Sequence, residues 1–476
     1  MSIVRNLVNV RLGFFRCLLL MVVMIIVTSN IFGKVRVETI NGLRYRLNST
    51  TKTATVISFN GRLNKGYLNV PRKVKASDQC LYLVTALGDK CFSACTSLTN
   101  ITIPSSVTSL GDECFDWCTS LMNITIPSSV TSLGNSCFYN CSSLPNIIIP
   151  SSVTFLGAGC FQDCSSLKSI TIPSSVTSLG GGCFLNCSSL TNITVPSSVT
   201  ELGLSCFQGC SSLTNITIPS SVTKLEDGCF LGCSSLSSIT IPSSVTELGV
   251  GCFSGCSSLS SITIPSSVTE LGAECFSGCS SLTSITIPSS VTELNNMFML
   301  FDGCSSLTNI TIPSLVTELG DMSFRGCSSL TSIVIPSSVT SLGSECFKGC
   351  SSLSSITIPS AVTELGDMSF KGCSSLTNIV IPSSVTSLGS ECFKGCSSLT
   401  SIVIPSSVMF FSVTERGSEI FDGCLKLKKV IFKGKIPFYA ESCDLPKTCN
   451  IFVPEEFLQE YKNAFKGYPN IYPSRE

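Results

Sequence analysis

Cysteine is the residue type with the greatest chemical potential in this chain: 30 of the 476 residues are cysteines, and none is a histidine. Most of the cysteines occur in pairs with the pattern C-F-x-x-C, such as Cys114 and Cys118, which would place two thiols about one helical turn apart. Thiols at this spacing can form disulfides, bind zinc or pack as small apolar side chains. The absence of histidine removes the commonest general base and the commonest metal ligand from the chain.

Packing is the role that we favour for these thiols, with disulfides between neighbouring units as the alternative. Met322-Ser323 and Met368-Ser369 replace the first cysteine of the pair in two units. Because one member is lost there without any other change, a required bridge is disfavoured. Zinc is disfavoured further, since four thiolates would have to converge across parallel units. We therefore expect two columns of buried thiols, no metal site and no cofactor.

The cysteine pairs belong to a 23-residue repeat that runs from about Leu98 to Leu427 and reads close to L-T-S-I-T-I-P-S-S-V-T-S-L-G-x-x-C-F-x-G-C-S-S. A fixed period of about 20 to 29 residues indicates a solenoid, whose units cannot fold alone and stack to share one core. The expected fold class is an α/β repeat solenoid with one short parallel strand and one short helical or 3₁₀ turn per repeat. Such a chain is predicted to be a monomeric rod.

Within one unit, Leu98-x-x-Ile101-x-Ile103 alternates as a strand with one buried face, and Pro104 ends the strand because proline cannot donate to a ladder. Two units are irregular: one contains two extra residues around 295–300, and the other has an insertion at 409–412. Departures from a repeat map to loops, which often contain binding sites. The alternative is sequence drift that the repeat array tolerates.

The ends of the chain differ from the repeat. Residues 1–33 are predicted to be a signal peptide, because Arg5, Arg11 and Arg16 precede an apolar run that is shorter than the about 20 residues needed to span a bilayer. A retained anchor is the alternative. Residues 34–67 are expected to form an N-terminal β-hairpin cap, residues 68–432 the repeats, and residues 433–476 a C-terminal cap with a terminal strand and helix. Strands over 38–45 and 53–59 would make the hairpin, and Phe457, Tyr461 and Phe465 would make the buried stripe of the helix.

Composition narrows the function. Lys plus Arg and Asp plus Glu are 30 each, and charged residues make up 13% of the chain, against roughly 25% in an average domain. No global field therefore favours nucleic acid or an anionic membrane as a partner. The chain also has no Gly-rich phosphate loop and no singular acidic pair, so we predict neither an enzyme nor a small-molecule substrate.

The repeated I-P-S-S-V-T-S-L-G-x-x-C-F-x-G-C-S-S-L-T, together with Ile451-Phe452-Val453-Pro454 near the end, resembles the BspA-like branch of the leucine-rich repeat proteins. The resemblance implies a leucine-rich repeat solenoid that is secreted or held at the cell surface and binds host, matrix or cell-surface proteins. It offers no catalytic residues to carry over. Many members have alanine rather than cysteine before the repeated phenylalanine, so the resemblance says nothing about the thiols.

Two columns of polar residues are the candidate partner-binding sites, and the predicted function is adhesion to proteins or cells, with a structural envelope spacer as the alternative. A Ser/Thr/Asn strand face is rich in hydrogen-bonding groups, although any solvated strand face looks the same. A basic column suggests an anionic partner, with pairing to Glu345 and Glu391 as the alternative. The strand-face candidates are Thr217, Thr240, Thr263, Thr286 and Thr311, and the basic column comprises Arg325, Lys348, Lys371 and Lys394.

Overall fold

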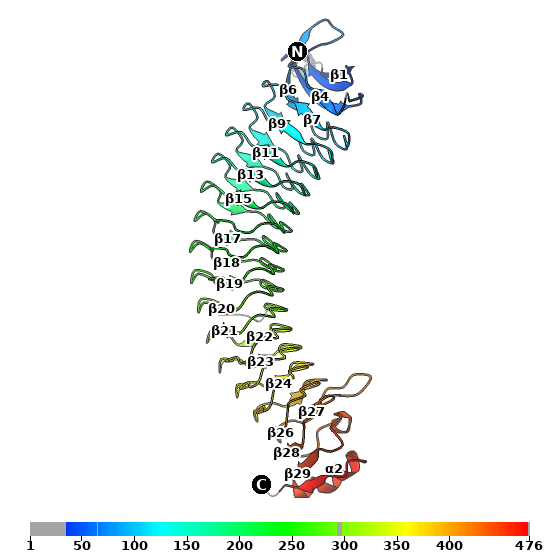
Figure 1. Cartoon of the computed structure of the whole chain (residues 1–476), viewed down its shortest axis with the longest axis vertical. Coiled ribbons are helices and arrows are strands. Elements are labelled where there is room, and N and C mark those ends of the chain that lie inside the picture. Colours follow the sequence, from blue (N-terminus) through cyan, green and yellow to red (C-terminus); the bar gives the residue numbers. More distant parts are fainter. Residues whose placement is uncertain (1–34, 64, 293–297, 475–476) are drawn as a thin grey trace, which may run out of the picture.

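A computed structural model describes residues 35–63, 65–292 and 298–474 of the chain. These residues form a long, curved solenoid of about 17 turns, with the first strands at one tip and the only α-helix of the described residues at the other (Figure 1). The predicted solenoid is confirmed. The predicted signal peptide, residues 1–33, lies outside the described residues.

Three antiparallel strands open the structure: β1 (Val35–Ile40), β2 (Leu43–Asn48) and β3 (Thr53–Phe59). The segment 38–45, predicted as one arm of a hairpin, is broken by a tight turn at Asn41 and Gly42, whose φ angles are 50° and 81°. Two adjacent left-handed residues are what a two-residue hairpin turn requires. The cap joins the repeats because β3 pairs in parallel with β6 (Leu81–Leu87), against which β5 (Lys73–Lys75) also pairs.

The first side of each coil is the predicted strand. Its isoleucines point into the core while the residue between them is exposed, and the following proline ends the pairing. Coils without an assigned strand continue the column through single bridges such as Thr217 to Thr240. The strands of this side are β4 (Tyr67–Asn69), β7 (Asn100–Thr102), β9 (Asn123–Thr125), β11 (Asn146–Ile148), β13 (Ser169–Thr171), β15 (Asn192–Thr194), β20 (Ser284–Thr286), β21 (Asn309–Thr311), β26 (Ser401–Ile404), β28 (Lys429–Phe432), β29 (Asn450–Val453) and β30 (Ile471–Pro473).

A second short strand occupies another side of the coil, whereas the sequence predicts only one strand per repeat. Its leucine is buried, and its backbone pairs with the equivalent residues one coil away, as in Leu110 with Leu133. These two-residue strands are β8 (Ser109–Leu110), β10 (Ser132–Leu133), β12 (Phe155–Leu156), β14 (Ser178–Leu179), β16 (Glu201–Leu202), β17 (Lys224–Leu225), β18 (Glu247–Leu248), β19 (Glu270–Leu271), β22 (Glu318–Leu319), β23 (Ser341–Leu342), β24 (Glu364–Leu365), β25 (Ser387–Leu388) and β27 (Phe410–Phe411).

The third side, which carries C-F-x-x-C, is a run of hydrogen-bonded turns, so the helical or 3₁₀ turn predicted for each repeat is not confirmed. Glu113 and Trp117 have φ angles of 52° and 56°, and left-handed residues interrupt a right-handed helix. The N–H of Phe115 accordingly donates to the carbonyl of Cys137 in the next coil, at 2.8 Å, instead of to its own turn. All three sides thus contribute hydrogen bonds between coils.

The core is a stack of like residues. Each repeated phenylalanine lies almost parallel to the next, as with Phe138 and Phe161, whose ring centroids are 5.4 Å apart with an interplanar angle of 1°. The far end is closed by the short helices η2 (Glu455–Phe457) and α2 (Leu458–Ala464). Tyr461 and Phe465 of this cap are buried against Phe432 of β28, whereas Phe457 is only partly buried. Another short helix, η1, spans Ala440–Ser442.

Candidate functional site

The five strand-face threonines lie in one exposed column. Thr217 pairs with Thr240, Thr240 with Thr263, and Thr286 with Thr311, while the isoleucines on either side of each threonine point into the core. The sheet therefore fixes the backbone of each threonine and leaves its hydroxyl and methyl groups to solvent. A hollow of about 400 Å³ on this face is lined by Thr263 and Thr286, among others. The column is a continuous polar surface without a deep cleft.

The basic column is a network of ion pairs. The Arg325 guanidinium donates two hydrogen bonds to the Asp302 carboxylate, at 2.8 and 2.7 Å, and this carboxylate holds the pKa of Arg325 above its ordinary value. Lys348 Nζ lies 3.0 Å from Glu345. Arg325 is thus paired with an acidic residue of the preceding coil, and Lys348 with an acidic residue of its own coil.

The other two cations of the column are also paired. Lys371 bonds to Glu391 and Lys394 to Glu419, and Asp422 lies 3.1 Å from Lys394. The hydrogen bond from Lys371 is the main cause of the lowered pKa of Glu391. Sequence reasoning named two of the acids but missed Asp302, Glu419 and Asp422, although Asp302 stands one 23-residue period before Arg325.

The predicted columns of buried thiols are confirmed. Every cysteine within the described residues is a free thiol, and only Cys80 and Cys95 are partly exposed. The closest pair is Cys91 and Cys114, whose sulfur atoms lie 3.5 Å apart. Burial raises the pKa of column thiols such as Cys164 and Cys392, to about 12 for each. These groups are therefore protonated at neutral pH, and a protonated thiol is neither a nucleophile nor a metal ligand.

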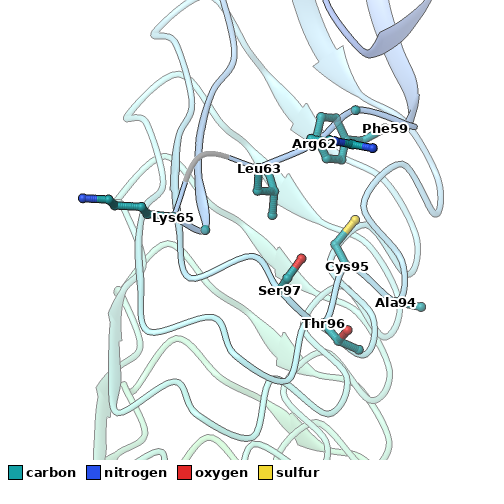
Figure 2. Close-up of a pocket in the computed structure, with 10 residues that line it drawn as sticks. Phe59, Arg62, Leu63, Lys65, Ala94, Cys95, Thr96 and Ser97 are labelled. Atoms are coloured by element: carbon teal, nitrogen blue, oxygen red, sulfur yellow. The ribbon is translucent and has the colours of Figure 1, made fainter.

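The cap loop and the first coil line an open cavity of about 560 Å³. Phe59 and Leu63 approach it from the cap, and the sulfur of Cys95 points toward them from the coil below (Figure 2). Lys65 points away from these side chains. Cys95 is the first thiol of the second column, and burial raises its pKa.

A second cavity, of about 570 Å³, lies beside the predicted irregular coil at 409–412. Met409, Ile436 and Phe438 contribute its apolar wall. The rings of Phe410 and Phe438 stack at 5.3 Å, and both side chains are exposed. The other irregular coil, near 295–300, falls partly outside the described residues.

Within residues 35–63, 65–292 and 298–474, no three His, Cys, Asp or Glu side chains are grouped so that they could hold a metal ion. No helix in these ranges has the length and apolar character needed to cross a bilayer.

The stacked coils, each with a strand, a turn side and an inward-facing leucine and phenylalanine core, define a leucine-rich repeat solenoid. The family model of the BspA type leucine rich repeat region matches residues 85–214, 177–300, 202–327 and 298–414. The chain belongs to this family, as the resemblance predicted.

One solved structure supports this assignment, and another is similar in sequence. A leucine-rich repeat protein from Bacteroides ovatus is 32% identical, with a TM-score of 0.71 over 83% of this chain and 99% of that one. A leucine rich cell surface protein from Faecalibacterium prausnitzii is 27% identical, with a TM-score of 0.48 over 86% of this chain and 98% of that one. A search of curated proteins found no match.

Proposed function

We propose that this protein is an exported, non-enzymatic leucine-rich repeat scaffold that adheres to host, matrix or cell-surface proteins through its strand face. The single observation that carries the proposal is the exposed column from Thr217 to Thr311, held in register by the sheet. Hydrogen-bonding groups on a fixed backbone lose little conformational freedom when a partner binds. Membership of the BspA type family supports the scaffold.

We place the primary contact on the threonines rather than on the basic column. Arg325 and the three lysines of that column each have an acidic partner, so an anionic ligand would have to compete with Asp302, Glu345, Glu391 or Glu419. Reversing the charge of all four cations should weaken adhesion only if the column also contacts the partner.

Retention from an extract of matrix or host-surface proteins tests the proposal. The array would be immobilised with Thr217, Thr240 and Thr263 changed to arginine, because a long charged side chain covers the face without entering the core. The matched control changes Thr223, Thr246 and Thr269 to arginine, since these threonines are also exposed and lie in the same coils on another side. Loss of retention in the first variant alone supports the proposal. Equal retention by all three proteins would place the contact on another surface, and no retention above background would indicate a structural spacer.

A further inference from the structure

Lysines outside the basic column carry the unpaired positive charge at the C-terminal end. Five of them fall within ten residues, and all five are exposed. In the described part of the chain, none of the five has a carboxylate within the 4.0 Å of an ion pair, unlike the four cations of the basic column. These residues, the lysine cluster, are Lys426, Lys428, Lys429, Lys433 and Lys435.

An apolar column lies on the same strand face, where the threonine of the repeat is replaced. Parallel pairing joins its members coil by coil. The exposed fractions are 70% for Val380, 41% for Val403 and 43% for Tyr472, which are high for apolar residues in a pleated sheet. The apolar column comprises Val380, Val403, Ile431, Phe452 and Tyr472.

The lysine cluster and the apolar column meet on β28. Side chains alternate along a strand, so Lys429 and Ile431 point to the same face, and Lys433 follows with its N–H bonded to the Ile404 carbonyl. The Nζ atom of Lys429 lies 5.1 Å from the centre of the Phe452 ring. That ring is in turn 5.6 Å from the ring of Tyr472. An apolar track thus has ammonium groups on both of its sides.

We propose that this track binds a linear acidic polysaccharide, with the apolar faces of the sugar rings on the apolar column and the carboxylate or sulfate groups on the lysines. Neighbouring strands lie about 4.8 Å apart, so the column of five residues is about 20 Å long and only one side chain wide. A long and narrow track fits a polymer better than it fits a globular protein, whose interface needs a broad patch of about 800 Å² on each partner.

Charge complementarity points to an anionic partner. Clustered lysines attract polyanions and release their counterions, and heparin-type sugars are a known occupant of such clusters. The nearest acidic residues along the chain are Asp422, which pairs with Lys394, and Glu441, and neither forms an ion pair with the lysine cluster among the described residues. Three of the five residues of the apolar column, Val380, Val403 and Ile431, cannot stack on bases as aromatic residues do, which disfavours a nucleic acid.

Two variants of the mature chain test the two halves of the site. Lys429→Gln with Lys433→Gln removes charge from the track, and Lys462→Gln with Lys466→Gln removes equal charge from the exposed surface of the C-terminal cap. Val380→Thr with Val403→Thr removes apolar surface and should fold, because threonine stands at this position in other coils, for example Thr357. Binding of a defined heparin-type oligosaccharide would be measured by calorimetry at two salt concentrations.

We expect the track lysine variant to bind at least about tenfold more weakly and with a flatter salt dependence. The valine variant should also lose affinity, and the cap variant should bind as the wild type does. Tighter binding of single-stranded DNA or of a polyglutamate peptide than of the oligosaccharide would overturn the proposal, as would equal losses in the track and cap variants. The outcome is independent of the strand-face threonines, so failure here leaves the proposed protein adhesion standing.

Discussion

The thiol of Cys210 donates a hydrogen bond to the backbone carbonyl of Phe184 in the preceding coil, with a sulfur to oxygen distance of 3.2 Å. The same carbonyl accepts the N–H of Cys187 at 3.1 Å. Equivalent thiol bonds recur from Cys118 to Cys424. The second cysteine of the pair is present in each described coil from Cys95 to Cys424, whereas the first is replaced by Leu300, Ser323, Ser369 and Ile420 in four of them. The second thiol column therefore links coils, and the first mainly fills space.

This difference predicts unequal costs for the two columns. Cys210→Ala removes the thiol donor and leaves a small cavity, so we expect the free energy of unfolding to fall by about 1–2 kcal/mol. Cys206→Ser, which copies the natural replacement in the first column, should cost less than about 1 kcal/mol. Urea unfolding followed by circular dichroism measures both. Equal losses would show that the thiol hydrogen bond contributes nothing beyond packing.

Burial also predicts which thiols react. Burial raises the pKa of column cysteines such as Cys164 and Cys392, so these form almost no thiolate at pH 8, and the sulfur atoms of the buried cysteines are inaccessible to reagents. Of the described cysteines in the native protein, we expect iodoacetamide to modify Cys80 and Cys95, and all of them after denaturation. Peptide mass spectrometry provides the measurement. Modification of the columns without denaturant would contradict the burial, and blocked thiols after denaturation without reductant would indicate disulfides.

Because the thiol pKa values are raised, the free energy of unfolding should depend on pH in alkaline solution. An ordinary cysteine loses its proton near pH 9.0, whereas Cys164 and Cys392 keep theirs until about 12 when folded. The unfolded chain therefore holds fewer protons than the folded chain between these values, and stability falls as pH rises. Stability should be fully present below about pH 9. Urea midpoints at pH 7, 8, 9 and 10 check this, and an unchanged midpoint would show that the thiols are already oxidised or accessible.

For Glu391 we predict the opposite pH dependence, a loss of stability in acid. Its pKa is lowered from 4.5, chiefly by the hydrogen bond from Lys371, so its contribution is present above that value and is lost as the pH falls through the folded pKa. Because the pair is partly solvated, Glu391→Gln should cost no more than about 1 kcal/mol at pH 7. Urea unfolding at pH 7 and pH 3 should show the difference between variant and wild type shrinking in acid. A difference that is constant with pH would indicate lost packing instead.

The fold is predicted from the periodicity of the sequence. The prediction failed where the backbone conformation, and not the hydrophobic pattern, determines the local structure. The strand that ends at Pro104 is visible because its isoleucines alternate. The second strand at Ser109–Leu110 is too short to have a period, and only the neighbouring coil defines it. The sequence predicts one helical or 3₁₀ turn on this side because left-handed residues such as Glu113 have no sequence signature, although Gly209 and other glycines recur there.

The candidate site was predicted less completely than the fold. The column of threonines followed from the period alone, because a residue between two buried isoleucines must face solvent. The pairing of Arg325 with Asp302 depends on two residues that are 23 positions apart but stacked in space. The lysines at 426–435 are plain in the sequence, yet only the register of β28 shows that they flank an apolar track.

The close stacking of coils predicts an unusual contrast between two glycines. A Cβ atom on Gly272 would lie 2.3 Å from the backbone nitrogen of Val250 in the preceding coil, which cannot move without separating the coils. We expect Gly272→Ala to cost about 3 kcal/mol or more, in the range of severe overpacking. Gly278 differs, since its Cβ would meet nothing closer than 3.5 Å and the obstacle is a φ of +70°.

Gly278→Ala should therefore cost only about 1 kcal/mol, the usual penalty for a left-handed residue. Gly278→Asn should cost less, because asparagine tolerates this conformation and Asn140 adopts it at the same position of an earlier coil, with a φ of 52°. The three variants would be compared by thermal unfolding, and hydrogen exchange at Val250 would report whether the coils separate locally. If Gly272→Ala proved as mild as Gly278→Asn, the spacing between coils would have to be softer than the backbone contacts indicate.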